Sequence, residues 1–305
     1  MALDIKYGVS TWLWTSPFST ASIQELFPRI ADMGFDVVEI AVEDPSLIDG
    51  SVVKKALDKY NLKAGICGAF GPSRDFTNED PAVHANCFNY IQACLDLCVE
   101  LDVKFLGGPM YSAVGKARMV SPEQRKKEWQ LAVTNLRKVC DAAARRGLKI
   151  ALEPLNRFES DLVNTADDVV RMVNDINHPA ANIMLDGFHM NIEERDLENA
   201  IITAGDKLIH LQVAENYRGT PGTGQTNWGA YRKGLEAINY NGTITIESFT
   251  TDNKELAGAV CFWRPMAENQ DLFATEGLRF LKQLINNNAD IYNHTPLKTS
   301  VNGKE

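Results

Sequence analysis

The chain has 305 residues, of which 45% are hydrophobic and 23% are charged, and its formal net charge is −9. This length is sufficient for a large buried core, in one α/β domain or in two smaller ones. The acidic balance disfavours nucleic acid and anionic membranes as partners, because like charges repel at long range.

No stretch of the sequence has the pattern of a targeting or membrane segment. The first residues, MALDIKYGVSTWLW, lack the basic and apolar regions of a signal peptide. No apolar run approaches the roughly 20 residues that span a bilayer. The six cysteines include no C-x-x-C pair, so we interpret them as reduced structural thiols. We therefore expect a cytoplasmic protein that binds neither membranes nor nucleic acid.

Strand and helix patterns alternate from one end of the chain to the other. The segments that resemble strands are residues 4–14, 36–42, 63–68, 103–109, 149–154, 182–188, 208–215 and 242–249. Helical patterns follow them at about residues 22–33, 51–60, 81–100, 122–146, from 165 onward, 196–203, 227–239 and 269–287. Ser121 before Pro122 and Thr165 before two acids are helix-start signals, and Gly147 is a stop signal.

Most of the strand segments are continuous apolar runs, which is typical of parallel strands buried on both faces. Eight strand–helix units predict an α/β fold, a single (β/α)₈ TIM barrel. We expect the catalytic barrel over residues 1–290 and a C-terminal tail over residues 291–305. A doubly wound open sheet is the alternative, but it usually has a Gly-rich fingerprint after its first strand, where this chain has STWLWTSPF.

Four oxygen-bearing side chains stand at the ends of four successive predicted strands. They are Glu153, Asp186, Gln212 and Glu247. In a TIM barrel these ends meet at one mouth, where the active site lies. Three carboxylates this close cannot all stay ionised without a cation, and an all-oxygen set suits Mg²⁺ or Mn²⁺. A single strand-end acid could simply cap a helix, but four on successive strands favour a metal site.

A second ring of polar residues follows the first. Glu159, His189, Glu215 and Arg218 lie a few residues beyond these strand ends and could hold a polyhydroxylated substrate. For Glu159, Glu215 and Arg218, a solvated loop salt bridge is an equally good interpretation. Without the metal set, His189 would be interpreted as a structural histidine.

Other strand-end residues have the chemistry of a sugar site. Trp14 and Phe249 could stack on a sugar ring, although each could equally fill the barrel mouth. Cys67 ends the third strand and could lie close to a substrate. Gly107 and Gly108 indicate a close backbone approach. His210 alternates with Gln212, and we interpret it as barrel filling, with support of the site as the alternative.

Several segments resemble the ketose 3-epimerases, the D-tagatose/D-psicose 3-epimerase group of the xylose-isomerase-like sugar isomerase superfamily. The most specific motifs are E-P-x-N-R-x-E in ALEPLNRFES and L-D-x-x-H in MLDGFHMN. Further similar segments are HLQVAENYRGTPGTGQTNW, TITIESF, GPSRDFTNEDP, GPMYSAVG and WRPMAENQD. The resemblance spans roughly residues 5–285.

The resemblance implies roles for particular residues. Glu153, Asp186 and Glu247 would be metal ligands, and Glu153 and Glu247 would also be the acid/base pair. The same resemblance implies that three further residues hold the substrate near its carbonyl end, namely Glu159, His189 and Arg218. It also implies a Mn²⁺ ion, with Co²⁺ or Mg²⁺ as substitutes, and a homo-oligomer, either a dimer or a tetramer.

One position departs from the epimerase pattern. Gln212 stands where these epimerases have a histidine as the fourth ligand. An amide oxygen is a harder and weaker donor than an imidazole nitrogen, which favours Mg²⁺ or Mn²⁺ and loosens the affinity. Hydroxypyruvate isomerases of the same superfamily are similar to this chain here, with H-x-Q followed by a PGTG loop.

The strand-end residues predict a type of reaction without reference to the family resemblance. Removing a proton beside a carbonyl builds negative charge on oxygen, and a divalent ion stabilises the resulting enediolate. Glu153 and Glu247 come from strands three apart, so one could remove the proton and the other return it to the opposite face. We therefore predict a metal-dependent sugar isomerase or epimerase that most simply inverts a ketose at C3.

Other functions stay open at this level. A hydroxypyruvate isomerase-like enzyme, or an inosose or 3-keto-sugar isomerase or dehydratase, could use the same metal site. A sugar-binding protein without catalysis is a further alternative. The endonuclease IV branch shares the barrel, but it uses a trinuclear zinc site with many histidines, whereas this chain has five and a net charge of −9.

Overall fold

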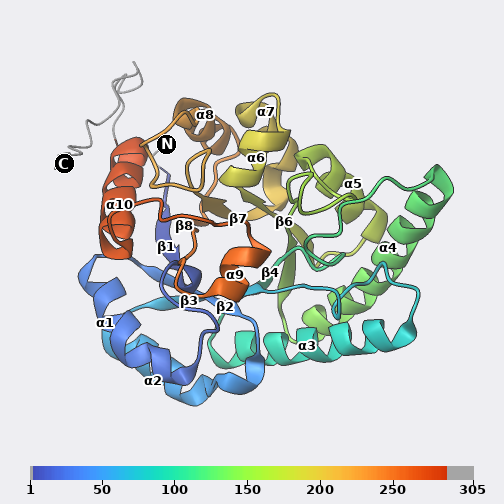
Figure 1. The fold of residues 1–305 in the computed structure, drawn as a ribbon, viewed down its shortest axis with the longest axis horizontal. Helices are drawn as coiled ribbons and strands as arrows, with labels where there is room; N and C mark the ends of the chain where they lie inside the picture. The colour runs from blue at the N-terminus through green and yellow to red at the C-terminus, as the bar shows by residue number, and fades with distance from the viewer. Residues whose placement is uncertain (1–2, 287–305) are drawn as a thin grey trace.

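Eight parallel strands form a closed barrel, and helices surround it (Figure 1). The computed structural model describes residues 3–286. Neighbouring strands pair in chain order from β1 to β8, and β8 pairs with β1 to close the barrel. The predicted (β/α)₈ TIM barrel is therefore confirmed, and the open-sheet alternative is wrong.

The strands are short and most of the helices are longer. The strands are β1 (Lys6–Ser10), β2 (Val37–Val42), β3 (Lys63–Gly68), β4 (Phe105–Gly108), β5 (Lys149–Leu152), β6 (Ala181–Asp186), β7 (Leu208–Val213) and β8 (Thr243–Ile246). The α-helices are α1 (Ile23–Asp32), α2 (Gly50–Tyr60), α3 (Pro81–Glu100), α4 (Pro122–Arg145), α5 (Ala166–Ile176), α6 (Gly187–Glu193), α7 (Leu197–Ala204), α8 (Trp228–Ala237), α9 (Lys254–Ala259) and α10 (Gln270–Asn286). Short 3₁₀ helices cover Thr11–Leu13, Thr20–Ser22, Pro45–Leu47 and Gly205–Lys207.

The apolar strands are buried on both faces, as their composition predicts. Every residue of β2 and of β6 is buried. One face of each strand packs against the surrounding helices and the other fills the barrel interior. This double burial is why a charged residue inside a strand, such as Glu39 in β2, must find partners within the barrel.

The predicted start and stop signals set the helix ends. The hydroxyl of Ser121 accepts a hydrogen bond from the backbone N–H of Gln124, and Thr165 forms a capping box with Asp168. Gly147 has a φ of +70°, which follows the end of α4 as the left-handed stop requires.

Several predicted strands are longer than the observed ones, and two helices, α6 and α9, are missing from the prediction. The strand predicted over 4–14 ends at Ser10, whose hydroxyl caps the 3₁₀ helix Thr11–Leu13. The strand predicted over 182–188 ends at Asp186, because the Asp186 carboxylate accepts from the backbone N–H of Phe188 and starts α6. Helix α9 lies in the segment that we predicted as a long loop.

The segment after β8 forms part of the barrel mouth. Phe249, Leu256 and Phe262 form a small apolar cluster, and Trp12 from the other end of the chain packs against it. In Figure 1, α9 lies in front of the strands near the centre of the barrel. The mouth is therefore enclosed by chain segments from both termini of the barrel.

Three further predictions concern the chain as a whole. All six cysteines are free, and Cys261 alone among them is exposed, which agrees with structural thiols. Within residues 3–286, no helix has the length and apolar character needed to cross a bilayer. The tail predicted over residues 291–305 lies outside the described residues, so the domain boundary stays a prediction.

A substitution at Gly108 measures how closely the backbones of β3 and β4 approach each other. Its φ is +128°, and an added Cβ would lie 2.9 Å from the carbonyl oxygen of Gly68. Gly115 also has a positive φ, +84°, but an added Cβ there meets no atom of the described residues within 4 Å. We expect Gly108→Ala to destabilise the protein by about 3 kcal/mol and Gly115→Ala by about 1 kcal/mol. Thermal unfolding measures both, and an equal loss would contradict the close approach.

Candidate active site

The four residues predicted at the strand ends lie side by side at one mouth of the barrel. Glu153 directly follows β5, Asp186 ends β6, Gln212 lies in β7 and Glu247 directly follows β8. The register pairs Asp186 with Gln212. Each of these four residues is at most 4% exposed. The barrel thus brings three carboxyl groups and one amide together away from bulk water.

A buried arginine supplies positive charge to this group. One guanidinium nitrogen of Arg218 contacts Asp186 Oδ2, and the other lies 3.1 Å from Glu247 Oε2. The guanidinium also lies over the rings of Phe188 and Phe249, at 4.4 and 5.1 Å from their centroids. Arg218 is 6% exposed, so the interpretation as a solvated loop salt bridge is wrong for this residue.

The electrostatic environment gives the three carboxyl groups different pKa values. Burial raises the pKa of Glu153 well above its ordinary value, and the charge of Asp186 raises it further. Burial also raises the pKa of Glu247, although Arg218 opposes the shift. Burial would also raise the pKa of Asp186, but the positive charge of Arg218 and the contact with His189 outweigh burial and lower this pKa to about 2. Two carboxyl groups that readily hold a proton therefore flank one that stays ionised.

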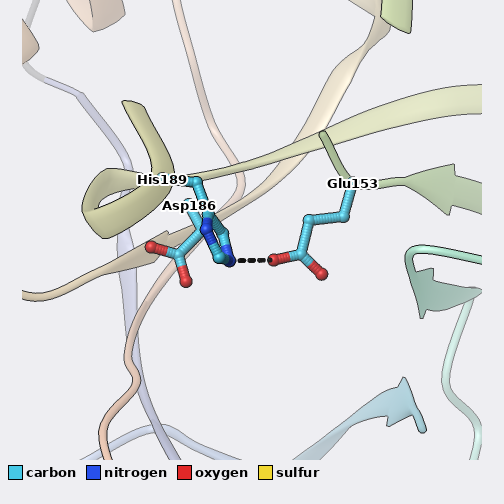
Figure 2. Close-up of side chains that lie close together, drawn as sticks. All are labelled: Glu153, Asp186 and His189. Carbon is cyan, nitrogen blue, oxygen red and sulfur yellow. Dashed lines mark ion pairs between the residues drawn. The ribbon is translucent and has the colours of Figure 1, made fainter. Parts of the chain in front are cut away.

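His189 reaches the same space from α6. In Figure 2 its ring points toward Glu153, and its Nε2 lies 3.7 Å from Glu153 Oε1. Its Nδ1 accepts a hydrogen bond from the backbone N–H of Asn156, at 3.1 Å. Burial lowers the pKa of His189, which favours the neutral ring. A neutral ring whose Nδ1 accepts must carry its proton on Nε2, so His189 presents an N–H donor to the site.

Asn156 connects His189 to Glu159. The Asn156 side-chain amide lies 2.8 Å from His189 Nδ1 and donates to Glu159 Oε1 at 2.7 Å. Asn156 is buried, whereas Glu159 is half-buried at the edge of the mouth. The E-P-x-N-R-x-E motif therefore places its asparagine between the two residues that were expected to hold a substrate.

The donors fit a hard divalent cation. The Oε1 atom of Gln212 is buried and has no hydrogen-bond partner among residues 3–286. An amide oxygen without a partner beside carboxylates is a favourable ligand for such an ion. One possible ligand atom from each of Glu153, Asp186 and His189 also lies within 4.8 Å of the other two. Because His189 Nε2 carries the proton, the carboxyl groups and Gln212 are better ligands than His189 in this arrangement.

The other predicted site residues, Cys67, Phe249 and Trp14, differ in their environments. Cys67 is buried in β3, and burial together with the charges of Glu39, Glu153 and Glu247 raises its thiol pKa well above the ordinary value. Phe249 contacts the Arg218 guanidinium, as described above. The indole N–H of Trp14 donates to Asp271, so this residue pairs with the start of α10. Trp14 lines a cavity of about 430 Å³ that includes Asp271.

Glu215 is a structural residue of the loop after β7. It is fully buried, and its carboxylate accepts from the backbone N–H groups of Gly222 and Thr226 and from the indole N–H of Trp228. The interpretation of Glu215 as a solvated salt bridge is therefore wrong. This carboxylate folds the Gly-rich loop back on itself and so places Arg218.

Glu39 is a charged residue of this region that the sequence analysis missed. Its carboxylate contacts His210 Nε2 and accepts from Gln212 Nε2 at 2.6 Å. His210 therefore supports the site through Glu39, and its interpretation as simple barrel filling is incomplete. The available signal was a single acid inside the apolar run VVEIAV, which is otherwise a fully buried strand.

A comparison with known proteins agrees with this geometry. The sequence profile described as "Xylose isomerase-like TIM barrel" matches residues 27–284. The chain belongs to the xylose isomerase-like TIM barrel family. This confirms the superfamily inferred from the sequence motifs.

Several relatives of this chain are ketose 3-epimerases. The L-ribulose 3-epimerase of Methylomonas sp. strain DH-1 is 32% identical over 281 residues, covering 92% of this chain and 97% of that protein. The D-psicose 3-epimerase of Ruminiclostridium cellulolyticum is 30% identical over 272 residues, covering 88% of this chain and 92% of that protein. The crystal structure of the Methylomonas sp. D-allulose 3-epimerase with D-allulose superposes with a TM-score of 0.85. That pair is 32% identical and covers 93% and 99% of the two chains.

The raised carboxyl pKa values predict how pH affects cation binding. Without a cation, Glu153 and Glu247 favour the fold in their protonated forms, so stability falls as pH rises above their ordinary value of 4.5. A cation must displace these protons, so its affinity rises with pH. We expect Mn²⁺ to raise the melting temperature more at about pH 8 than at about pH 5.5. Differential scanning fluorimetry with and without EDTA measures this, and a larger effect at the lower pH would contradict it.

The Asn156 contacts predict the protonation state of His189. We expect ¹⁵N NMR of the metal-free protein at neutral pH to show a neutral His189 ring with its proton on Nε2. Asn156→Asp should raise the pKa of His189, because a carboxylate beside Nδ1 favours the charged ring. A His189→Gln variant assigns the signals. A proton on Nδ1 in the unchanged protein would contradict the proposed hydrogen-bond pattern.

Proposed function

We propose that this protein is a divalent-metal-dependent ketose 3-epimerase. The observation that carries the proposal is the convergence of Glu153, Asp186 and Glu247 at the barrel mouth beside Gln212, whose Oε1 has no hydrogen-bond partner within residues 3–286. The similarity to ketose 3-epimerases over most of the chain supports the same reaction. The 3-epimerase relatives favour C3 inversion over the hydroxypyruvate, inosose and 3-keto-sugar alternatives.

The proposed ligands are the four strand-end residues, Glu153, Asp186, Gln212 and Glu247. A divalent ion bound to them would stabilise the negative charge that develops on a carbonyl oxygen when the neighbouring C–H proton is removed. Asp186 has a pKa of about 2, so it provides a permanent negative charge for the ion. Gln212 provides a neutral oxygen, which limits the total charge of the ligand set.

Glu153 and Glu247 are the proposed acid/base pair. They follow β5 and β8, which are three strands apart in the closed barrel, so they reach the mouth from different directions. Burial raises the pKa of both carboxyl groups, which makes each able to hold the proton that it removes. A proton removed by one and returned by the other reaches the opposite face of the carbon, and this inverts C3.

Three further residues are proposed to bind the sugar near its carbonyl. His189 offers the Nε2–H donor, and Glu159 accepts hydrogen bonds at the edge of the mouth. Arg218 contacts the same two carboxylates, Asp186 and Glu247, that a divalent ion would use. Like charges compete for one site, so we expect cation binding to free at least part of the guanidinium for a substrate oxygen.

We also propose further substrate contacts, the identity of the metal ion, the cellular location and the oligomeric state. Cys67 and Phe249 would form walls of the substrate site, and Trp14 would contact the sugar from the β1 side. We propose Mn²⁺ as the ion, with Mg²⁺ or Co²⁺ as substitutes, because the donors are oxygens. We also propose a cytoplasmic homo-oligomer, a dimer or a tetramer, which light scattering after size exclusion measures.

Deuterium exchange tests the proposed reaction. We expect an incubation in D₂O with Mn²⁺ to place deuterium at C3 of at least one ketose and to form its C3 epimer, as seen by NMR. EDTA should abolish both. Glu153→Gln and Glu247→Gln should each lower the rate by about 10³-fold, because each removes one proton-transfer group. Glu236→Gln, a change on the exposed face of α8, is the matched control and should leave the rate unchanged.

The same incubation separates the alternatives. No exchange with any ketose in the panel would contradict the proposal. Turnover of hydroxypyruvate, a keto-inositol or a 3-keto sugar without exchange in ketoses would favour an isomerase or dehydratase at the same site. Sugar binding that persists in EDTA and in Glu153→Gln, without turnover, would favour a binding protein.

A further inference from the structure

The side chain of Glu39 reaches across the inside of the barrel and contacts strand β7 at His210 and at Gln212, one of the proposed metal ligands. Glu39 lies in β2, and its partners Gln212 and His210 lie in β7. Strands β1 and β8 separate β2 from β7 in the closed barrel. Glu39 is 1% exposed, so its carboxyl group is almost entirely removed from water. A buried carboxylate is costly unless donors surround it, and here β7 provides those donors.

The hydrogen bonds of Gln212 determine which way its amide faces. Nε2 donates one hydrogen to Glu39 Oε1 at 2.6 Å and the other to Glu247 Oε1 at 2.9 Å. If the amide were reversed, its oxygen would face two carboxyl oxygens, and the contacts would be repulsive wherever those groups are ionised. The observed orientation uses both amide hydrogens, and among the described residues it leaves Oε1 without a hydrogen-bond partner.

We propose that Glu39 is a positioning residue that keeps the Gln212 carbonyl oxygen available to the divalent cation. This inference rests on the proposed function, because it assigns Gln212 as a ligand. Glu247 makes the second contact to the amide, but Glu247 is itself a proposed ligand and base. Glu39 has no such role, so its contribution to cation binding acts through Gln212 and can be measured separately.

The proposal explains why a charged residue is retained inside an apolar strand. A glutamine at position 39 would fill nearly the same volume, but its amide could pair with Gln212 in either orientation. The Gln212 oxygen would then be turned away from the cation for part of the time. A carboxylate only accepts hydrogen bonds when ionised, so it selects one orientation of the neighbouring amide.

A double-mutant cycle on Mn²⁺ affinity tests this role. The variants are Glu39→Gln, Gln212→Ala and the double variant, and electron paramagnetic resonance measures the Mn²⁺ dissociation constant of each. We expect Glu39→Gln to weaken Mn²⁺ binding by about tenfold, the usual effect of losing a residue that orients a metal ligand. In the Gln212→Ala background the same change should have no effect, because there is no amide left to orient.

Glu43→Gln is the matched control. Glu43 lies just beyond β2 and accepts hydrogen bonds from Trp12 Nε1, the hydroxyl of Ser16 and the backbone N–H of Phe18. The same chemical change there should leave the Mn²⁺ affinity unchanged while altering stability. The melting temperature of each metal-free variant separates a loss of folding from a loss of affinity.

The outcomes separate the inference from the proposed function. An equal loss of affinity from Glu39→Gln in both backgrounds, or no loss in either, would overturn the positioning role while the metal site stands. If Glu39→Gln prevents folding, Glu39→Asp provides the second test. We expect this shorter side chain to keep the fold, to lose contact with Gln212 and to weaken Mn²⁺ binding in the same background-dependent way. Absence of Mn²⁺ binding by the unchanged protein would overturn the proposed function together with the inference.

Discussion

Negative charge buried inside the barrel is the constraint on which the rest of the site depends. Glu39, Glu153, Asp186 and Glu247 are each at most 4% exposed. Burial of several carboxyl groups is unfavourable unless protons, donors or cations compensate for it. The structure uses Arg218 against Asp186 and Glu247, and it uses the Gln212 amide between Glu39 and Glu247. Each compensating group is therefore part of the proposed chemistry as well as of the fold.

Arg218 is held by parts of the chain outside the strands. Glu215 organises the loop after β7, and the backbone of Arg218 in that loop has a left-handed φ of +63°. The hydroxyl of Ser248, just after β8, donates to the carbonyl oxygen of Arg218 and secures this conformation. The strand ends thus supply the carboxyl groups and the Gln212 amide, and the loop after β7 supplies the guanidinium that balances two of these carboxyl groups.

Local patterns predicted most elements because each pattern has a local physical cause. Buried parallel strands read as apolar runs, and helix starts such as Ser121 and Thr165 depend on hydrogen bonds within one turn. The misses have equally specific causes. Phe188 follows the apolar run of β6 after only Asp186 and Gly187, so the predicted strand included it and hid the helix that Asp186 caps. Helix α9 is a short helix whose start depends on Asn253. Glu39 was missed because a lone acid in a strand gives no sign of its partner.

The sequence by itself determined the barrel and the set of strand-end side chains. Apolar runs that alternate with helical patterns eight times along the chain are enough to place the carboxyl ends of the strands at one mouth. Only the tertiary structure decided how these groups pair. The hydrogen bond from Gln212 to Glu39 joins residues that are 173 positions apart, and that from Asn156 to His189 joins residues 33 apart. The free oxygen of Gln212 and the proton on His189 Nε2 both follow from such contacts. Amide direction and ring protonation are set by the neighbours in space, and no local pattern specifies these neighbours.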